Sequence, residues 1–384
     1  MTAHGSDDAP MDIALLAPLV APIRQPYLGG AQALLRDLAV SLAARGHTVT
    51  LYAAQGSDPV TLPDVTLTEI AVDAARVRPS DFAAPPDAKA APVDPAVEHA
   101  FAHACDLIGA RVPRHMLLHA HAYDGPAFLQ TQRLRMPVAH TLHMPALDPA
   151  IDAILSALVP ARQPRAPRQP WLVTVSQACA ATYSDICRID AVVYNGIDLA
   201  AIPFGAAPAP DGHALYAGRI TPEKGVEDAI EIALAAGTRL ILVGDIYDQG
   251  YYATRIEPLL AAHPNRLTYL GPRSREGVWE LMSQAAAVLV PSHWDEPFGL
   301  VACEAQAVGA PVIGYAAGGL REVVAQGQTG ALVGRGQIAE AAVALREVAR
   351  YDRRECRQRV AAHFSLEATV AGYEALYRSM LAAL

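Results

Sequence analysis

Two cations in one short segment are the first feature of this 384-residue chain that could carry chemistry. Arg219 and Lys224 belong to GRITPEKG, which follows the apolar run ALYAG. A guanidinium can bind phosphate through two hydrogen bonds, and a lysine amine adds a compact mobile charge. Because two cations at a helix start are unfavourable without an anion, the segment favours a phosphate site. The structural alternative is that the turn residues of this segment only begin the next helix.

Two glutamates eight residues apart form the second pattern. Glu296 and Glu304 belong to EPFGLVACE, directly after the apolar run AVLVPS. Pro297 is expected in the first turn of a helix, and Gly299 would let a ligand approach free N–H groups at its positive end. Carboxylates beside a phosphate site can accept hydrogen bonds from sugar or ribose hydroxyls. The structural alternative is that Glu296 favours a helix start and Glu304 lies on a solvated face.

A third candidate is a histidine at the end of a predicted strand. His121 lies in LLHAHAYDG, after the apolar residues Met116 to Leu118. The chain has 13 histidines, and a given histidine more often lies on the surface or is bonded in the core than takes part in a functional site. The strand-end position nevertheless favours a ligand-lining role for His121, with His119 less favoured and His143 a comparable candidate.

The elements that must position these residues alternate between strand and helix. Residues 12–17, 31–45 and 48–53 form a βαβ unit, and apolar runs follow at 116–118, 137–139, 171–175 and 191–194. After the Pro-rich stretch 206–211, strand and helix alternate strictly to about residue 325. This pattern predicts two α/β, Rossmann-like, doubly wound domains, 1–206 and 207–365, facing a cleft, with a final helix over 366–384 that returns to the first domain.

Composition excludes several classes of protein. Hydrophobic residues make up 52% of the chain and charged residues 18%, which excludes disorder as the main state. The net charge is -9, so nucleic acid is not an expected partner. Five scattered cysteines without a CxxC pair suggest neither disulfides nor a zinc site. With no apolar run of about 18 residues and no signal segment, we expect a cytoplasmic protein. The GGAQ loop is not a GxGxxG fingerprint, which disfavours a nicotinamide enzyme.

Four segments in this order resemble the retaining GT-B glycosyltransferases of family 4. They are YLGGAQ at 27–32, VYNGID at 193–198, GRITPEKG and EPFGLVACE, and the resemblance covers nearly the whole chain. It implies a transfer of a hexose-type sugar from a nucleoside diphosphate sugar to a hydroxyl acceptor, with retention of configuration.

The resemblance also implies roles for individual residues. Arg219 and Lys224 would hold the donor pyrophosphate, Glu296 the hydroxyls of the transferred sugar, and Glu304 the ribose. His121 matches a family histidine near the reacting carbon. The remaining donor contacts would come from two glycine loops and a helix start: Gly29, Gly30, Gly271, Arg273, Phe298, Gly299 and Leu300.

On the acceptor side we expect Tyr123, Asp124, His143 and the loop 24–27. Two cations and a helix dipole would already neutralise the charge of the pyrophosphate, and no DxD triplet lies at the end of a strand. We therefore expect no metal ion or other cofactor. Weak contact with a membrane surface is compatible with the composition, but no basic amphipathic helix marks it.

Two other functions stay open at this point. The same fold could epimerise or hydrolyse the donor, which would show as donor turnover that is independent of acceptor. A non-catalytic nucleotide-binding protein would tolerate loss of Lys224. The nucleotide base, the sugar, the acceptor and the oligomeric state are not encoded in these motifs.

Overall fold

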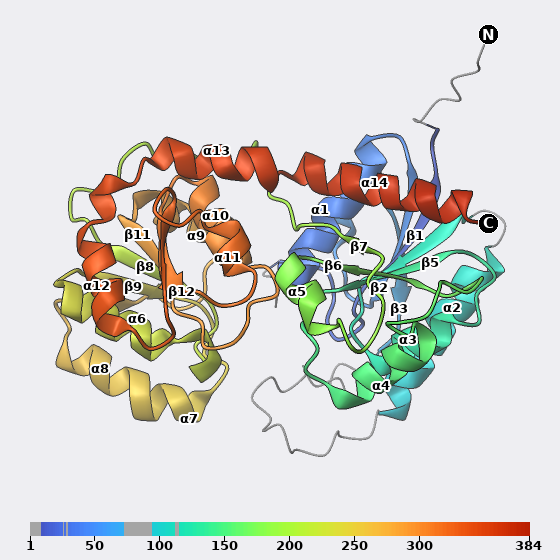
Figure 1. Cartoon of the computed structure of the whole chain (residues 1–384), viewed down its shortest axis with the longest axis horizontal. Coiled ribbons are helices and arrows are strands. Elements are labelled where there is room, and N and C mark those ends of the chain that lie inside the picture. Colours follow the sequence, from blue (N-terminus) through green and yellow to red (C-terminus); the bar gives the residue numbers. More distant parts are fainter. Residues whose placement is uncertain (1–8, 26, 28–29, 73–93, 112–114) are drawn as a thin grey trace, which may run out of the picture. The chain divides into compact units, whose positions relative to one another are not determined.

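The computed structural model describes residues 9–25, 27, 30–72, 94–111 and 115–384. By its internal contacts the chain divides into two units, each with its own parallel sheet (Figure 1). The first unit contains the described residues up to Val175, together with Ala180–Val193 and Val370–Leu384, and the second contains Ser176–Cys179 and Tyr194–Thr369. The predicted α/β architecture with two Rossmann-like sheets is therefore confirmed.

The first unit has a seven-stranded sheet in the order β3-β2-β1-β4-β5-β6-β7, with every pair parallel. Its strands are β1 (Asp12–Leu16), β2 (Thr48–Ala54), β3 (Thr66–Ile70), β4 (Leu117–Ala120), β5 (Val138–Leu142), β6 (Trp171–Thr174) and β7 (Ala191–Val192). The helices of this part of the sequence are α1 (Gly30–Ala44), α2 (Pro95–Ala110), α3 (Gly125–Thr131), α4 (Pro149–Leu158), α5 (Gln177–Thr182) and, at the C-terminus, α14 (Leu366–Ala382).

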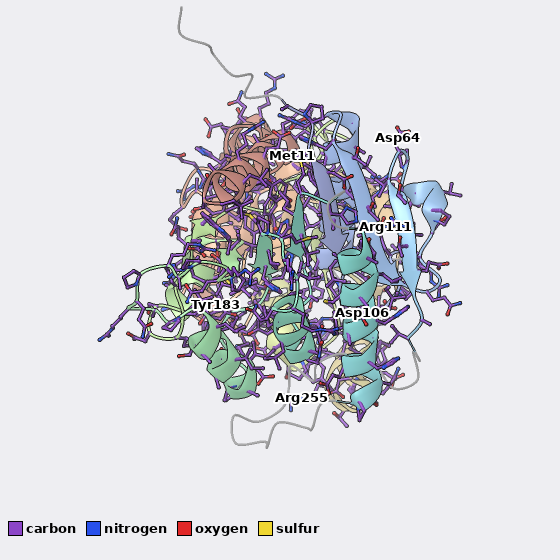
Figure 2. All side chains as sticks on the ribbon, turned by 90° about the vertical axis from the view of Figure 1, so that its right-hand side faces the viewer. Met11, Asp64, Asp106, Arg111, Tyr183 and Arg255 are labelled. Atoms are coloured by element: carbon purple, nitrogen blue, oxygen red, sulfur yellow. The ribbon has the colours of Figure 1, made fainter. Side chains whose placement is uncertain are left out.

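Alternate residues of β4 face opposite layers of the first unit. Leu118 belongs to a buried cluster that includes Phe101 and Ile108 of α2. His119 instead contacts Tyr377 of α14. At the solvent side, Arg133 donates to Asp106 of α2 (labelled in Figure 2) at 2.7 Å. The two-residue period of the strand thus divides its side chains between an apolar layer and a layer that contains histidine.

The second unit has a six-stranded parallel sheet in the order β10-β9-β8-β11-β12-β13. Its strands are β8 (Ala214–Ala217), β9 (Leu240–Val243), β10 (Leu267–Tyr269), β11 (Ala287–Val290), β12 (Val312–Tyr315) and β13 (Gly330–Val333). Its helices are α6 (Val226–Ala236), α7 (Gln249–Tyr251), α8 (Glu257–Ala262), α9 (Arg275–Gln284), α10 (Leu300–Ala307), α11 (Leu320–Val323), α12 (Ile338–Arg346) and α13 (Arg353–His363).

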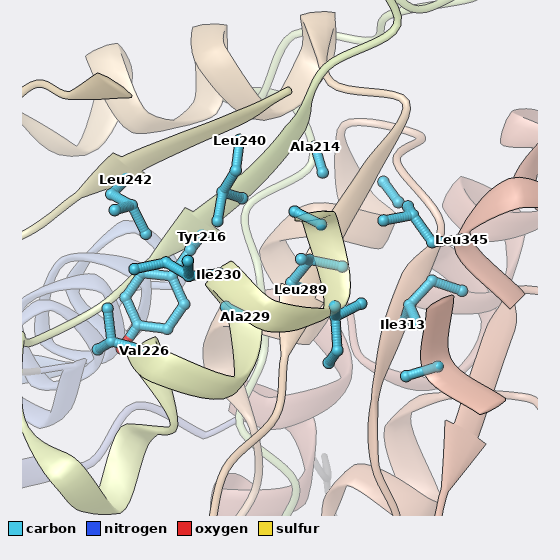
Figure 3. Close-up of a cluster of buried hydrophobic side chains, with 14 of the residues drawn as sticks. Ala214, Tyr216, Val226, Ala229, Ile230, Leu240, Leu242, Leu289, Ile313 and Leu345 are labelled. Atoms are coloured by element: carbon cyan, nitrogen blue, oxygen red, sulfur yellow. The ribbon is translucent and has the colours of Figure 1, made fainter. Parts of the chain in front are cut away.

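One face of this second sheet is covered by α6 and α12. Figure 3 shows Leu242 and Leu289 from the sheet with Ile230 of α6 and Leu345 of α12, all in one buried cluster. The strands carry apolar residues at successive positions, as expected where helices cover both faces of a parallel sheet. This packing holds the carboxyl ends of β8 and β11 side by side, because these two strands are paired in register.

Several boundaries differ from the prediction. The edge strands β3 and β13 were not predicted, since β3 alternates with polar residues and β13 is only four residues long. The helical segment that follows β9 is not a regular α-helix, because a π-helical turn at Tyr252–Ile256 separates α7 from α8. Pro258 follows this turn and has no N–H to donate within the helix.

Candidate active site

The predicted donor residues of the second unit gather at the carboxyl edge of its sheet. Arg219 follows β8 directly, and Lys224 closes a short 3-10 helix, Pro222–Lys224, on the same loop. Glu296 follows β11, the strand that pairs with β8. Because the strands are parallel, their carboxyl ends meet at this edge and bring Lys224 and Glu296 into contact.

The contact is an ion pair with a third member. Lys224 Nζ donates to Glu296 Oε1 at 2.7 Å, and Ser292 Oγ donates to the same oxygen at 2.8 Å. The amine also lies 4.6 Å from the centroid of the Trp294 ring, within range of a cation–π interaction. The side chains of Lys224 and Glu296 are 20% and 12% exposed. The pair is thus held firmly and still reaches the surface of the unit.

Glu296 stays ionised despite its burial. Burial alone would raise the pKa of this carboxyl, but the charge of Lys224 and the hydrogen bonds from Lys224 and Ser292 outweigh it and lower the pKa. The site therefore presents one fixed carboxylate and one fixed ammonium group at neutral pH. Such a pair can accept hydrogen bonds from hydroxyls and donate to phosphate oxygens.

The helix after Glu296 begins later than predicted. Pro297 lies outside it, and α10 begins at Leu300 with Gly299 as its N-cap at φ +99°. A Cβ at Gly299 would lie 2.6 Å from Leu320 Cδ2, so both the backbone angle and the space require glycine. Within the described residues, the N–H groups of Gly299 and Leu300 have no hydrogen-bond acceptor. They can therefore bind an anion at the positive end of the helix.

Phe298 contributes to this site through its backbone. Its ring is buried against Tyr194 and Phe364, with ring centroids 6.2 Å and 5.5 Å away. The ring anchors the segment, so the predicted role of Phe298 can involve only its main chain.

A glycine pair that the sequence analysis did not select packs directly on this segment. Gly319 N donates to the carbonyl of Glu296 at 2.7 Å. A Cβ at Gly318 would lie 2.7 Å from the backbone nitrogen of Glu296, and one at Gly319 2.7 Å from Phe298 Cα. Only residues without a side chain allow this approach, so Gly318 and Gly319 define the path of the chain at Glu296.

Glu304 occupies a separate ion pair. It lies in the second turn of α10 and accepts a hydrogen bond from Arg275 Nε at 3.0 Å. Both side chains are partly exposed, at 15% and 17%. The two glutamates of the motif therefore face different cations, as expected if they contact different parts of one ligand.

The other second-unit candidates lie on nearby loops. Arg219 approaches Glu223 at 3.5 Å, and its guanidinium carbon lies 5.3 Å from the ring centroid of Tyr247. Gly271 follows β10 at φ +72° and leaves the space beside it open. Arg273 is exposed. The structure thus brings Lys224 and Glu296 together directly, whereas Arg219 and Glu304 have other partners.

In the first unit, the predicted histidines form one group in which His119 and His121 are buried and His143 is half-buried. His121 follows β4 and His143 follows β5, and these strands are paired. His121 Nδ1 lies 2.9 Å from His143 Nε2, and the ring of His119 lies 4.1 Å from that of His121. Burial, with the neighbouring histidines, lowers the pKa of His121 well below its usual value, and burial lowers that of His143 to about 4. All these rings are neutral at pH 7.

The two acceptor-side candidates after His121 differ in their contacts. Tyr183, labelled in Figure 2, donates from its hydroxyl to that of Tyr123 at 3.0 Å. Asp124 is the N-cap of α3, yet its side chain makes no capping hydrogen bond. Burial raises the pKa of this carboxyl to about 6. Gly30 is the exposed first residue of α1, while Gly29 and part of the loop 24–27 lie outside the described residues.

The residues that sequence reasoning missed here are Trp294, Arg275, Gly318 and Gly319, together with the side chain of Ser292. Ser292 and Arg275 each follow a strand of the second sheet closely, the same signal that selected Arg219. In the part of the chain that the structure describes, no group of three or more His, Cys, Asp or Glu residues could hold a metal ion. Among the same residues, no helix is both long and apolar enough to cross a membrane.

Two family models together match most of the chain. A family model described as Glycosyltransferase Family 4 matches residues 28–201, and one described as Glycosyl transferases group 1 matches residues 204–362. A glycogen synthase of Mycobacterium tuberculosis is 30% identical, and the match covers 91% of each chain. The fold and these matches define a glycosyltransferase of the GT-B type. Within that class, the chain belongs to glycosyltransferase family 4.

Other known proteins resemble part or all of the chain. A D-inositol 3-phosphate glycosyltransferase of Mycolicibacterium smegmatis is 34% identical over 46% of this chain and 43% of its own length. The structure of a sucrose-phosphate synthase from Thermosynechococcus elongatus aligns with a TM-score of 0.78 at 23% identity, covering 97% of this chain and all of that one. HepE of Anabaena aligns with a TM-score of 0.69 at 20% identity, with the same coverage.

Proposed function

We propose that this glycosyltransferase moves a hexose-type sugar from a nucleoside diphosphate sugar to a hydroxyl acceptor with retention of configuration. The observation that carries the proposal is the Lys224–Glu296 ion pair in the unit that also presents the Gly299 helix start. A carboxylate suits sugar hydroxyls, while an ammonium group and free N–H groups suit a diphosphate. The second unit therefore has the chemistry to hold a sugar nucleotide.

The reaction needs stabilisation of a leaving diphosphate. As the bond between the sugar and the diphosphate breaks, negative charge grows on the phosphate oxygens. Lys224, Arg219 and the N–H groups of Gly299 and Leu300 would stabilise that charge, and this is electrostatic catalysis. In the retaining route that we propose, the acceptor hydroxyl attacks from the leaving-group side and a phosphate oxygen takes its proton. Glu296 would orient the transferred sugar, and Glu304 would hold the ribose.

We assign acceptor binding to the first unit. His121, Tyr123, Asp124 and His143 lie at or after the ends of two of its central strands. His121 would contact the reacting sugar, and Asp124 offers a carboxyl without a capping role. The proposed reaction uses no metal ion, because the diphosphate charge is met by Arg219, Lys224 and the helix start. Transfer in excess chelator would support this part of the proposal, and its complete loss would contradict it.

The first test is binding of nucleoside diphosphates. UDP comes first because HepE has been crystallised with UDP and glucose, followed by GDP, ADP, dTDP and CDP. A ligand at 100 times its Kd adds about 2.7 kcal/mol of stability, which a thermal-shift assay resolves. We expect one diphosphate to raise the Tm of the wild type and to raise that of Lys224→Ala much less. If no diphosphate shifts the Tm, the donor assignment is wrong.

The second test is the stereochemistry of the product. With the matching donor sugar and an accepted alcohol, proton NMR of the anomeric position compares product with donor. The same anomeric configuration in both supports retention, and the opposite configuration excludes it. Donor turnover at an equal rate without any acceptor would instead indicate an epimerase or a hydrolase.

A further inference from the structure

The contact between His121 and His143 joins two rings that have little freedom. His121 Nδ1 and His143 Nε2 are 2.9 Å apart, and the rings stack with centroids 5.2 Å apart and 28° between their planes. On the other side of His121, the ring of His119 is itself fixed. Its Nδ1 bonds to the hydroxyl of Tyr377, and its Nε2 to that of Thr141, both at 2.7 Å.

The proton positions of the pair are linked. A neutral imidazole has one N–H donor and one bare acceptor nitrogen, so a hydrogen bond between two of them needs one of each. If His143 Nε2 carries the proton, His121 must accept at Nδ1 and carry its own proton on Nε2. If His121 Nδ1 carries it, His121 Nε2 is bare. The tautomer of either ring therefore determines that of the other.

The second nitrogen of His121 is left without a partner. His121 Nε2 is buried and has no hydrogen bond within the described residues. Buried polar atoms without a partner are uncommon, and each one calls for an explanation. A ligand oxygen would supply the missing partner, because Nδ1 is already engaged by His143.

We propose that His143 is a positioning residue for His121: its Nε2 holds His121 Nδ1 and confines that ring to one tautomer, so that Nε2 is the atom offered to the reacting sugar. This proposal rests on the proposed function, because it assumes that His121 contacts the sugar. It replaces the expected role of His143 as a residue that only lines the acceptor side. His143 then acts through His121 and need not touch substrate.

Three variants separate positioning from structural support. His143→Phe keeps a ring but removes both nitrogens, and His143→Gln can return a polar group near the position of Nε2. The matched control is His140→Gln. His140 is a buried histidine of β5, the strand that precedes His143, but its side chain contacts Thr131 and Phe128 of α3.

The primary measurement is nitrogen-15 NMR of the histidine rings, which needs no ligand. In the wild type we expect one protonated and one bare nitrogen on His121, with well-separated chemical shifts. In His143→Phe these shifts should move toward each other as the two tautomers mix. His143→Gln and His140→Gln should keep them apart. Unchanged His121 shifts in His143→Phe would overturn the proposal.

The second measurement is release of UDP from UDP-glucose. We expect His143→Phe to lower kcat by about 100-fold with KM for UDP-glucose within about twofold, as misplacement of a reacting group does. His143→Gln should recover most of the loss. Equal losses in the two variants would contradict positioning through Nε2. If the wild type releases no UDP, UDP-glucose is not its donor, and the NMR comparison still decides whether His143 sets the tautomer.

Discussion

Lys224 Nζ and Glu296 Oε1 lie 2.7 Å apart although 72 positions separate the two residues in the sequence. Two paired strands of the second sheet, β8 and β11, end beside each other and bring their following loops together. Ser292 adds a second hydrogen bond to the same carboxylate oxygen. The ion pair therefore depends on the strand order, and each partner is positioned before any ligand arrives.

Removal of the lysine charge should affect both rate and stability. Lys224→Ala leaves the Glu296 carboxylate without its cation, and we expect a loss of about 2 kcal/mol in the free energy of unfolding. Loss of one charge-stabilising donor should also lower kcat by about 100-fold or more. Urea unfolding and steady-state kinetics measure the two effects. Arg350→Ala is the control, because it removes a cation from an exposed ion pair with Glu347 and should change neither.

The two glutamates of the motif should have different effects on kinetics. Glu304→Gln keeps the shape of the side chain but weakens its bond to Arg275, so we expect a KM for the donor that rises about tenfold with kcat nearly unchanged. Glu296→Gln should instead lower kcat, because Glu296 orients the transferred sugar. Steady-state kinetics with varied donor separates these outcomes. An identical kinetic pattern in both variants would contradict separate roles.

Stability should fall in mild acid because of the buried histidines. Burial lowers the pKa of His140 to about 3, against about 6.5 in an unfolded chain. Between these values the unfolded chain binds a proton that the native protein does not, so the free energy of unfolding decreases as the pH falls. The slope from one such histidine is about 1.4 kcal/mol per pH unit. His140→Gln should therefore show a shallower decline between pH 6 and pH 4 than the wild type, measured by urea unfolding. Parallel curves would show that His140 is not responsible.

A methyl group at Gly318 should disturb the active site through the backbone. Gly318 has φ +51°, and a Cβ there would lie 2.7 Å from Glu296 N. The control is Gly327→Ala, at φ +78° with no atom within 4 Å of the added carbon. The control should lose about 1 kcal/mol from the backbone angle alone. Gly318→Ala should lose more stability and most of its activity. Equal losses in thermal unfolding and in rate would show that the loop yields to the methyl group.

Much of the fold was predictable because both sheets are parallel and repeat a strand and helix pattern. The runs ALYAG and AVLVPS predict strands β8 and β11, whose following loops carry Lys224 and Glu296, and their apolar character follows from burial on both faces. The edge strand β3 has polar residues at alternate positions, and the sequence alone does not tell which segments pair with it. Pro297 was a misleading signal, since proline is common in a first helical turn and here precedes the helix.

The candidate site was predictable in residue type but not in pairing. The positions of Arg219, Lys224, Glu296 and Glu304 after strands placed them at one sheet edge. The partners were not predictable, since Lys224 bonds to Glu296 and Glu304 to Arg275 only after the loops take their final paths. The packing of Gly318 against the backbone of Glu296 was also not predictable. A glycine in the sequence does not indicate which other part of the backbone approaches it.

The chain contains only two lysines, Lys89 and Lys224, among its 30 basic residues. The amine of Lys224 can therefore be observed selectively by NMR. Reductive methylation with carbon-13 formaldehyde would label these two amines and the chain terminus, so a methyl spectrum would hold very few signals. The Lys224 signal would report the environment of the amine beside Glu296 and Trp294 directly. A titration with each sugar nucleotide could then be followed at one of the groups that are expected to bind the diphosphate.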